Sequence, residues 1–211
     1  MKKSRIKEIV NFYQAGNYKT AEKEIIPLIE KSPDNLSLLH LFGGILVAQK
    51  KYERALECLK KAIKINPNIP ETHYNLGYIF AELKQYDESV RSYSQAIKIN
   101  PSYIKAFNNL GTIFKIQNRF KESINMFNKI IDIDENFEDS YKNLAFIYCD
   151  ICRIDEAQKW FDSLTNVLTE RENSYVLMNG PIIAGREHFF WGVRIFSKLD
   201  LFKGFRCSKK K

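Results

Sequence analysis

Three asparagines, Asn75, Asn109 and Asn143, stand 34 residues apart in the sequence. A carboxamide side chain carries two N–H donors and an oxygen acceptor, so it can hydrogen-bond to a peptide backbone whatever side chains that peptide has. Three such groups act together only where equivalent elements hold them in equivalent places. If the chain itself repeats every 34 residues, the three side chains would form a column of such hydrogen-bonding groups.

Residues that could support catalysis or bind a metal are few. Cys149 and Cys152 form a lone C-x-x-C pair, whereas a zinc site needs about four ligands and a redox pair is typical of a thioredoxin-like βαβ context. The histidines His40, His73 and His188 are scattered, and no Ser-His-Asp set, phosphate-binding loop or pair of carboxylates accompanies them. The sequence predicts a protein that is not an enzyme and uses no cofactor or metal.

The apolar residues follow the same 34-residue interval. An apolar residue followed by a small one recurs as Phe42-Gly43, Leu76-Gly77, Leu110-Gly111 and Leu144-Ala145, and a further small residue recurs as Ala21, Ala55, Ser89, Ser123 and Ala157. Five copies follow one another without a gap, at residues 2–35, 36–69, 70–103, 104–137 and 138–171. A fixed period of this length indicates a repeat architecture.

Each copy is typical of two helices. In the third copy, Leu76 and Phe80 belong to a set of apolar residues with the spacing of one buried helix face, over roughly residues 71–84. Gly77 has no side chain, so the second helix can approach the first closely at that point. The turn that follows is expected to end at Asp87, as the N-cap of the second helix.

These positions resemble the tetratricopeptide repeat (TPR) pattern W-x2-L-G-x2-Y, A-x3-F, P, which has a period of about 34 residues. The resemblance covers residues 2–171, about four-fifths of the chain. It implies an all-α fold, a right-handed superhelical solenoid of five helix hairpins with a C-terminal extension. A single hairpin cannot bury its apolar face alone, and stacking on its neighbours creates the continuous core.

Two copies depart from the pattern. In the first, Ile9 occupies the small-residue position, and Pro27 falls inside the second helix, where it removes a backbone hydrogen bond. We expect residues 2–35 to form a capping repeat with a kinked second helix. In the fourth, Glu135 replaces the closing proline, which should let the second helix continue or change the junction.

The first helices of TPR proteins line a concave face, along which partners commonly lie. The resemblance places Asn75, Asn109 and Asn143 there as an asparagine ladder. Other inward positions hold His40, Tyr74, Tyr78, Lys105, Asn108, Thr112, Lys142 and Phe146. Aromatic side chains offer contact area at low conformational cost, and lysines could meet acidic groups. The alternative is an ordinary solvated surface.

A more specific TPR subfamily is disfavoured. The chaperone-binding TPRs clamp a C-terminal carboxylate with a set of lysine, asparagine and arginine side chains on three first helices. In copies two to four, only Asn75 and Lys105 match that set.

The last 40 residues differ in composition from the repeats. Residues 172–211 hold eight Lys or Arg against three Asp or Glu, so they contribute +5 of the net charge of +8, and they are rich in aromatic residues. Three roles remain open for this extension. It could cap the apolar end of the fifth copy, bind a partner or a second copy to form a homo-oligomer, or attach residues 186–211 to an anionic membrane surface.

Composition excludes several classes of protein. The charge left for the repeats is only +3, which disfavours a solenoid that binds nucleic acid along its length. The N-terminal residues lack the apolar stretch of a secretory signal, and no window reaches the roughly 18 apolar residues of a membrane span. The four cysteines form no disulfide framework, so a cytoplasmic location is expected.

The sequence thus predicts a non-catalytic adaptor or scaffold that binds a peptide segment of a partner protein in the concave groove. The alternative is a scaffold that works through its basic aromatic extension, by self-assembly or at a membrane surface. A third possibility is a targeting arm for a separate enzyme subunit, because TPR arrays often accompany catalytic domains.

Overall fold

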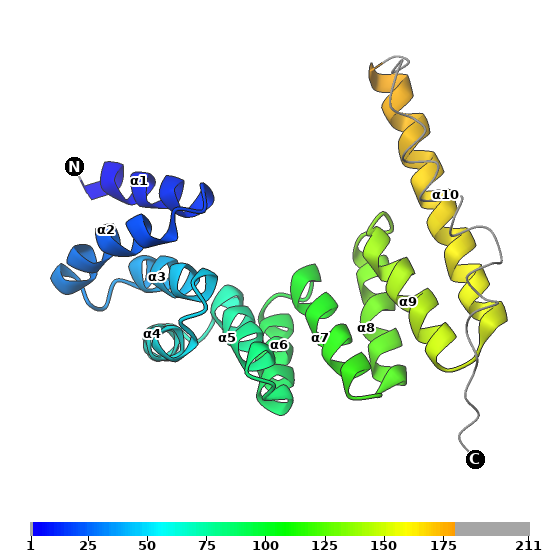
Figure 1. Ribbon diagram of the computed structural model, residues 1–211, viewed down its shortest axis with the longest axis horizontal. Helices are drawn as coiled ribbons and strands as arrows, with labels where there is room; N and C mark the ends of the chain where they lie inside the picture. Colours follow the sequence, from blue (N-terminus) through cyan, green and yellow to red (C-terminus); the bar gives the residue numbers. More distant parts are fainter. Residues whose placement is uncertain (1, 180–211) are drawn as a thin grey trace. The chain divides into compact units, whose positions relative to one another are not determined.

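The computed structural model describes residues 2–179, with side chains for residues 5–169, and all the regular structure in this range is α-helical. The helices are α1 (Lys2–Gln14), α2 (Tyr18–Lys31), α3 (Leu36–Ala48), α4 (Tyr52–Ile65), α5 (Pro70–Glu82), α6 (Tyr86–Ile99), α7 (Ile104–Ile116), α8 (Phe120–Ile133), α9 (Glu138–Asp150) and α10 (Ile154–Asn179). They are labelled in Figure 1. The predicted all-α fold of helix hairpins is confirmed.

Helix boundaries recur with the 34-residue period of the sequence. Odd-numbered helices, here called first helices, begin at 2, 36, 70, 104 and 138, and even-numbered second helices begin at 18, 52, 86, 120 and 154. A first helix such as α5 has 13 residues and a second helix such as α6 has 14. α10 is longer, with 26 residues, and continues beyond position 171.

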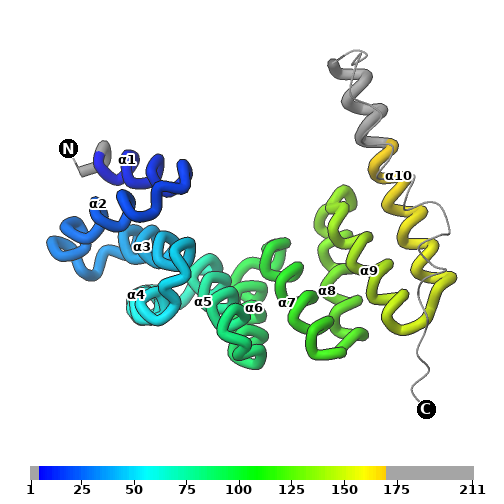
Figure 2. The backbone as a smooth tube through the Cα atoms, viewed as in Figure 1, coloured from blue at the N-terminus to red at the C-terminus, as the bar shows by residue number. Residues whose placement is uncertain are grey.

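The chain divides into two compact units, Met1–Ile113 and Phe114–Lys211, each described by itself. In unit 1, consecutive helices from α1 to α6 pack against one another, and α3 also contacts the next first helix, α5. Figure 2 traces these hairpins in chain order. In unit 2, α8 packs against α9 and α9 against α10. The predicted basic segment 186–211 lies outside the described residues.

Every hairpin turn uses the same backbone device. One residue in each turn has positive φ, between 58° and 75°: Gly16, Lys50, Lys84, Asn118 and Cys152. In the third repeat the N–H of Lys84 donates to Ala81 and that of Gln85 donates to Phe80. These bonds satisfy the last carbonyls of the first helix, as in a Schellman motif. The turn is therefore shorter than predicted, and Asp87 is not the N-cap but lies in the first turn of α6.

The junctions between repeats are closed by short polar side chains. A side-chain oxygen accepts a hydrogen bond from the N–H two residues further on in three successive junctions: Asn66 from Asn68 at 2.9 Å, Asn100 from Ser102 at 3.1 Å and Asp134 from Asn136 at 3.0 Å. This local bond stabilises a turn in place of the next helical residue. Of the two predicted effects of Glu135, the continuation of the second helix was wrong, because α8 has the same 14 residues as α4 and α6, and a change of the junction angle stays a prediction.

In the second and third hairpins a glycine of the first helix lies against a large side chain of the second helix. A Cβ added at Gly77 would lie 2.6 Å from a ring carbon of Tyr93, and one added at Gly43 would lie 2.7 Å from Leu59 Cδ2. Tyr93 and Leu59 are buried. The glycines therefore admit a large side chain from the second helix, as the sequence predicted for Gly77.

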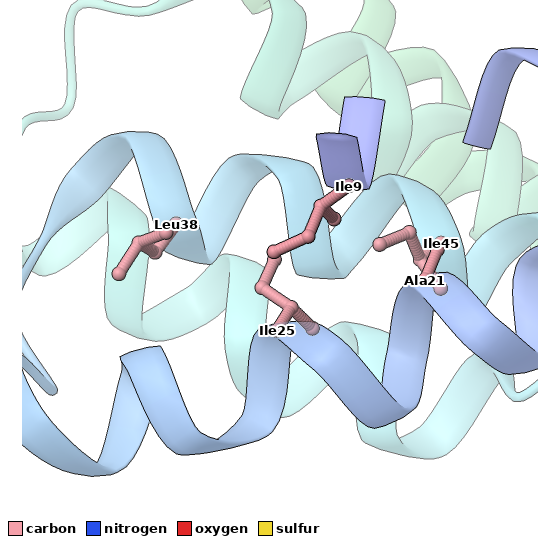
Figure 3. Close-up of a cluster of buried hydrophobic side chains, with 5 residues drawn as sticks. All are labelled: Ile9, Ala21, Ile25, Leu38 and Ile45. Carbon is pink, nitrogen blue, oxygen red and sulfur yellow. The ribbon is translucent and has the colours of Figure 1, made fainter. Parts of the chain in front are cut away.

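The first repeat departs from this arrangement, with an isoleucine on each helix. Ile9 of α1 occupies the position of those glycines, and the opposing residue of α2 is Ile25, smaller than Tyr93. Both isoleucines are fully buried with Ala21, and two residues of α3 complete the cluster (Figure 3). Pro27 lies inside α2, which begins in register and runs on to Lys31.

Candidate peptide-binding surface

The exposed face of α5 carries a stripe of four side chains, Glu71, Tyr74, Tyr78 and Glu82, here called the α5 stripe. Their spacings of three, four and four residues place them on one face of the helix. The two carboxylates are exposed at the ends, and the two tyrosines between them are half-buried. The stripe thus combines aromatic contact area with two negative charges.

Tyr74 is fixed by a cluster of aromatic rings and an amide. Its ring centroid lies 5.7 Å from that of Tyr93 and 5.3 Å from that of Tyr103. Asn109 of α7 donates from Nδ2 to the hydroxyl oxygens of Tyr74, at 3.2 Å, and Tyr93, at 3.0 Å. Asn109 is therefore held by α5 and α6, and its amide oxygen takes no part in these two bonds.

Sequence reasoning missed this role of Asn109. Tyr93 is 1% exposed, and a buried tyrosine hydroxyl normally needs a hydrogen-bond partner. The equivalent position holds an apolar residue in the other four repeats: Ile25, Leu59, Phe127 and Phe161. The single tyrosine in that column was the available signal that a nearby polar side chain would be used internally.

The other end of the stripe is also tied to its neighbour. Tyr52, the first residue of α4, donates its hydroxyl to Glu82 Oε2 at 3.0 Å. Burial, and then this bond to the carboxylate, raise the pKa of Tyr52 to about 12. Burial and the nearby Glu71 and Tyr74 likewise raise the pKa of Tyr103 to about 12. Because burial and the nearby glutamates raise both pKa values, a further negative charge is disfavoured at both ends of the stripe.

The two carboxylates of the stripe lack a cationic partner. Among the described side chains, no lysine or arginine forms an ion pair with Glu71 or Glu82. His40 lies near Glu71 and is hydrogen-bonded to Thr72 Oγ1. Burial lowers the pKa of His40 against the opposing effect of Glu71.

The remaining predicted residues of unit 1 differ in their exposure and in their hydrogen bonds. Asn75 is half-buried and Lys105 is exposed. The Oδ1 atom of Asn108 is buried without a hydrogen-bond partner among the described residues. Thr112 is exposed, but its hydroxyl donates to the backbone oxygen of Asn108 at 2.9 Å, within its own helix. Of the predicted residues in unit 1, Tyr74 and Asn109 are in direct contact.

In unit 2, the predicted residues lie on α9. Phe146 is 37% exposed and packs edge-on against Phe161, with ring centroids 5.9 Å apart. Lys115 Nζ lies 5.6 Å from the Phe146 centroid and 3.5 Å from an oxygen of Asp150. Lys142 pairs with Asp139 at 3.3 Å, and Asn143 is half-buried.

Cys149 and Cys152 lie at the end of the first helix α9 and in the turn that follows it. Cys149 is buried among Ala145, Ala157 and Phe161, and burial raises the pKa of its thiol. Cys152 occupies the positive-φ turn position, so the C-x-x-C spacing coincides with the end of a first helix. No group of three or more His, Cys, Asp or Glu that could hold a metal occurs in the described part of the chain.

Comparison with protein families agrees with this geometry. A family model described as TPR repeat matches residues 43–84 and again residues 77–115, and one described as tetratricopeptide repeat matches residues 104–137. The chain is a tetratricopeptide repeat protein. A curated relative of this TPR chain is the UDP-N-acetylglucosamine–peptide N-acetylglucosaminyltransferase of Caenorhabditis elegans, 35% identical over 65 residues. That match spans 31% of this chain and only 6% of the transferase.

Solved structures share the fold of the TPR chain. The alignment with a crystal structure of MamA covers 77% of this chain and 95% of the MamA chain, with 21% identity and a TM-score of 0.72. MamA from Desulfovibrio magneticus RS-1 covers 81% and 95%, with 20% identity and a TM-score of 0.68. YrrB, described as a TPR protein with an unusual peptide-binding site, covers 77% and 84%, with 16% identity and a TM-score of 0.64.

None of the helices within residues 2–179 combines the length and the apolar character needed to cross a bilayer.

Proposed function

We propose that this chain is a non-catalytic interaction scaffold that binds a peptide segment of a partner protein along the exposed face of its first helices. The observation that carries the proposal is the α5 stripe with its fixed surroundings. Tyr74 is held by two rings and by the amide of Asn109, so the surface is ordered before a ligand arrives. A preordered aromatic surface reduces the entropy cost of binding.

The hydrogen-bonding groups beside the stripe suit a peptide backbone. Asn75 is half-buried on the same helix, and the amide oxygen of Asn109 is left as an acceptor by the bonds to the two tyrosines. Tyr78 adds a half-buried aromatic side chain. YrrB, with the same fold, is described as having a peptide-binding site, which supports this use of the fold.

The experiment is a pull-down with the full-length chain from an extract of its own cells, followed by mass spectrometry. The test variant is Asn75→Ala with Tyr78→Ala, because neither side chain is needed for the hydrogen bonds around Tyr93. The matched control is Glu57→Ala with Lys60→Ala, two exposed residues of the second helix α4. Circular dichroism confirms that both variants keep their helicity.

The proposal predicts that proteins retained by the wild type and by the α4 control are lost with the α5 variant. A synthetic peptide from a retained protein should then bind the wild type with modest affinity in calorimetry and bind the α5 variant at least tenfold more weakly. Equal retention by all three chains would refute binding on this face.

A further inference from the structure

An uncharged face of α3 lies beside the α5 stripe within unit 1. α3 and α5 are in contact, and the helix α3 contains no Asp, Glu, Lys or Arg among its 13 residues. The residues of α3 that stand 34 positions before the stripe are Ser37, His40, Gly44 and Ala48. A helix without charged residues is normally buried on all sides, yet Leu41, Gly44 and Ala48 are only half-buried. This face of α3 therefore has apolar surface left for a ligand.

Two contacts place the carboxylates of the stripe toward the two ends of this face. His40 of α3 is hydrogen-bonded to Thr72 Oγ1, next to Glu71 in the sequence. Tyr52, which begins α4 just after α3, donates its hydroxyl to Glu82 Oε2 at 3.0 Å. The two glutamates are 11 residues apart on α5, so their Cα atoms are separated by about 16 Å, at 1.5 Å rise per residue. The face thus has a negative charge toward each end.

These two charges are not neutralised by the described part of the chain. Neither Glu71 nor Glu82 forms an ion pair with a described lysine or arginine. Lys105 of α7, the equivalent of Glu71 in the next repeat, is exposed and forms no ion pair with it. Tyr74 and Tyr78 lie between the glutamates, and tyrosine rings accept both apolar groups and cations. The surface is complementary to an apolar segment with a cation at each end.

We propose that α3 and the α5 stripe bind an extended basic segment of a partner protein, with an apolar side chain against Tyr74 and Tyr78 and a lysine or arginine at each glutamate. The inference rests on the proposed function, because it uses the same surface, and it names the chemistry of the ligand. An extended chain rises about 3.3 Å per residue, so about five residues span the distance between the glutamates. Segments with acidic residues at those positions are repelled, so the same charges select against them.

Selection from a random peptide library displayed on phage tests the ligand chemistry before any partner is known. The target is the immobilised full-length chain, and the clones kept are those that bind the wild type but not Asn75→Ala with Tyr78→Ala. The expected sequences have an aliphatic or aromatic residue between two basic residues four to six positions apart. A parallel selection on Glu71→Lys with Glu82→Lys should enrich acidic residues at those positions instead.

Conservative variants separate the charge from the fold. Glu71→Gln and Glu82→Gln remove the charges, and the amide oxygen of a glutamine at position 82 can still accept the hydrogen bond of Tyr52. In calorimetry at low salt, a synthetic peptide of the enriched sequence should bind each variant about threefold more weakly and the double variant about tenfold, as expected for exposed charge pairs. High salt should remove these differences. Glu53→Gln with Glu57→Gln, two exposed glutamates of α4, should bind like the wild type.

The proposal is overturned if the enriched peptides lack the paired basic residues, if the lysine variant enriches the same sequences, or if the glutamine variants bind them unchanged. A wild-type chain that dimerises while the double glutamine variant stays monomeric would assign the face to a second copy, which also overturns it. Failure of the proposed function is distinguishable. Peptides that depend on Asn75 and Tyr78 but not on the glutamates leave the scaffold function standing, whereas a selection without any such peptide removes both.

Discussion

Replacing Gly77 by alanine tests whether close helix approach is what holds each hairpin together. The added Cβ would lie 2.6, 2.7 and 2.9 Å from three ring carbons of Tyr93. The ring cannot move aside easily, because Tyr93 is 1% exposed and its hydroxyl accepts a hydrogen bond from Asn109. We therefore take the upper part of the usual overpacking cost, about 3 kcal/mol. Alanine returns about 1 kcal/mol of helix propensity, so the net loss of stability is about 2 kcal/mol.

A neighbouring glycine provides the matched control. A Cβ added at Gly44 would lie 3.5 Å from the hydroxyl oxygen of Tyr13, an ordinary van der Waals distance. Gly44 is also inside a 13-residue first helix, α3, so Gly44→Ala makes the same chemical change without the clash. This substitution should raise the free energy of unfolding by about 1 kcal/mol, through helix propensity alone. The two substitutions are thus expected to have opposite signs.

Urea unfolding followed by circular dichroism at 222 nm measures both effects. Repeat arrays need not unfold in one step, but both glycines belong to unit 1, so we expect the same transition to report on both. The shift of the midpoint multiplied by the m-value gives the change in free energy. If Gly77→Ala proved neutral or stabilising like Gly44→Ala, the two helices could separate without cost and the packing argument would be refuted.

Three further substitutions test the turn, the charge cluster and the amide. Lys84→Gly should stabilise unit 1 by about 1 kcal/mol in the same assay, because φ of +59° strains a residue with a side chain; destabilisation would show that the turn is unstrained. Glu22 is buried, which raises its pKa, but hydrogen bonds from Lys51, Gln49 and Arg54 outweigh burial and lower it. The stabilising effect of the Glu22 carboxylate is therefore present above about pH 4.3 and lost as the pH falls through its folded-state pKa. Glu22→Gln should lower the free energy of unfolding by about 1 kcal/mol at pH 7 and reduce its pH dependence below pH 5. An unchanged dependence of the unfolding free energy on pH would contradict this. Asn109→Ala should cost about 1 to 2 kcal/mol in the wild type but less in a Tyr93→Phe background, since the buried hydroxyl is then absent and only the half-buried Tyr74 loses a donor; equal costs would exclude the bond to Tyr93 as the cause.

The period of the sequence was sufficient to predict the fold, because it reports packing that every repeat must satisfy. Gly77 was predicted to allow a close approach, and Tyr93 fills that space. The helix ends were harder to predict, since they depend on backbone bonds that leave little trace in composition. The positive-φ turn accepts lysine as well as glycine, and an aspartate at position 134 stops α8 without a proline.

The candidate site was predicted only in part. A periodic column identifies which residues share a position, but not which of them bond to one another. Asn109 and Asn75 have the same place in the repeat, yet only Asn109 contacts two tyrosine hydroxyls. Glu71 and Glu82 do not belong to the asparagine column, and their spacing along α5 was the signal that sequence reasoning did not use.

The residue pairs that join the helices of the first three hairpins also limit how these repeats can be recombined. A chimera with its crossover between the hairpin turns at residues 16 and 84 would combine a first helix from one repeat with a second helix from another. Ile9 could then face Tyr93, two large side chains in a space that holds one, or Gly77 could face Ile25 and leave a void. Crossovers at the junctions, at residues 35, 69 and 103, keep each pair intact. The unit that can be exchanged between such chains is therefore the whole hairpin, bounded by its junctions and never by its turn.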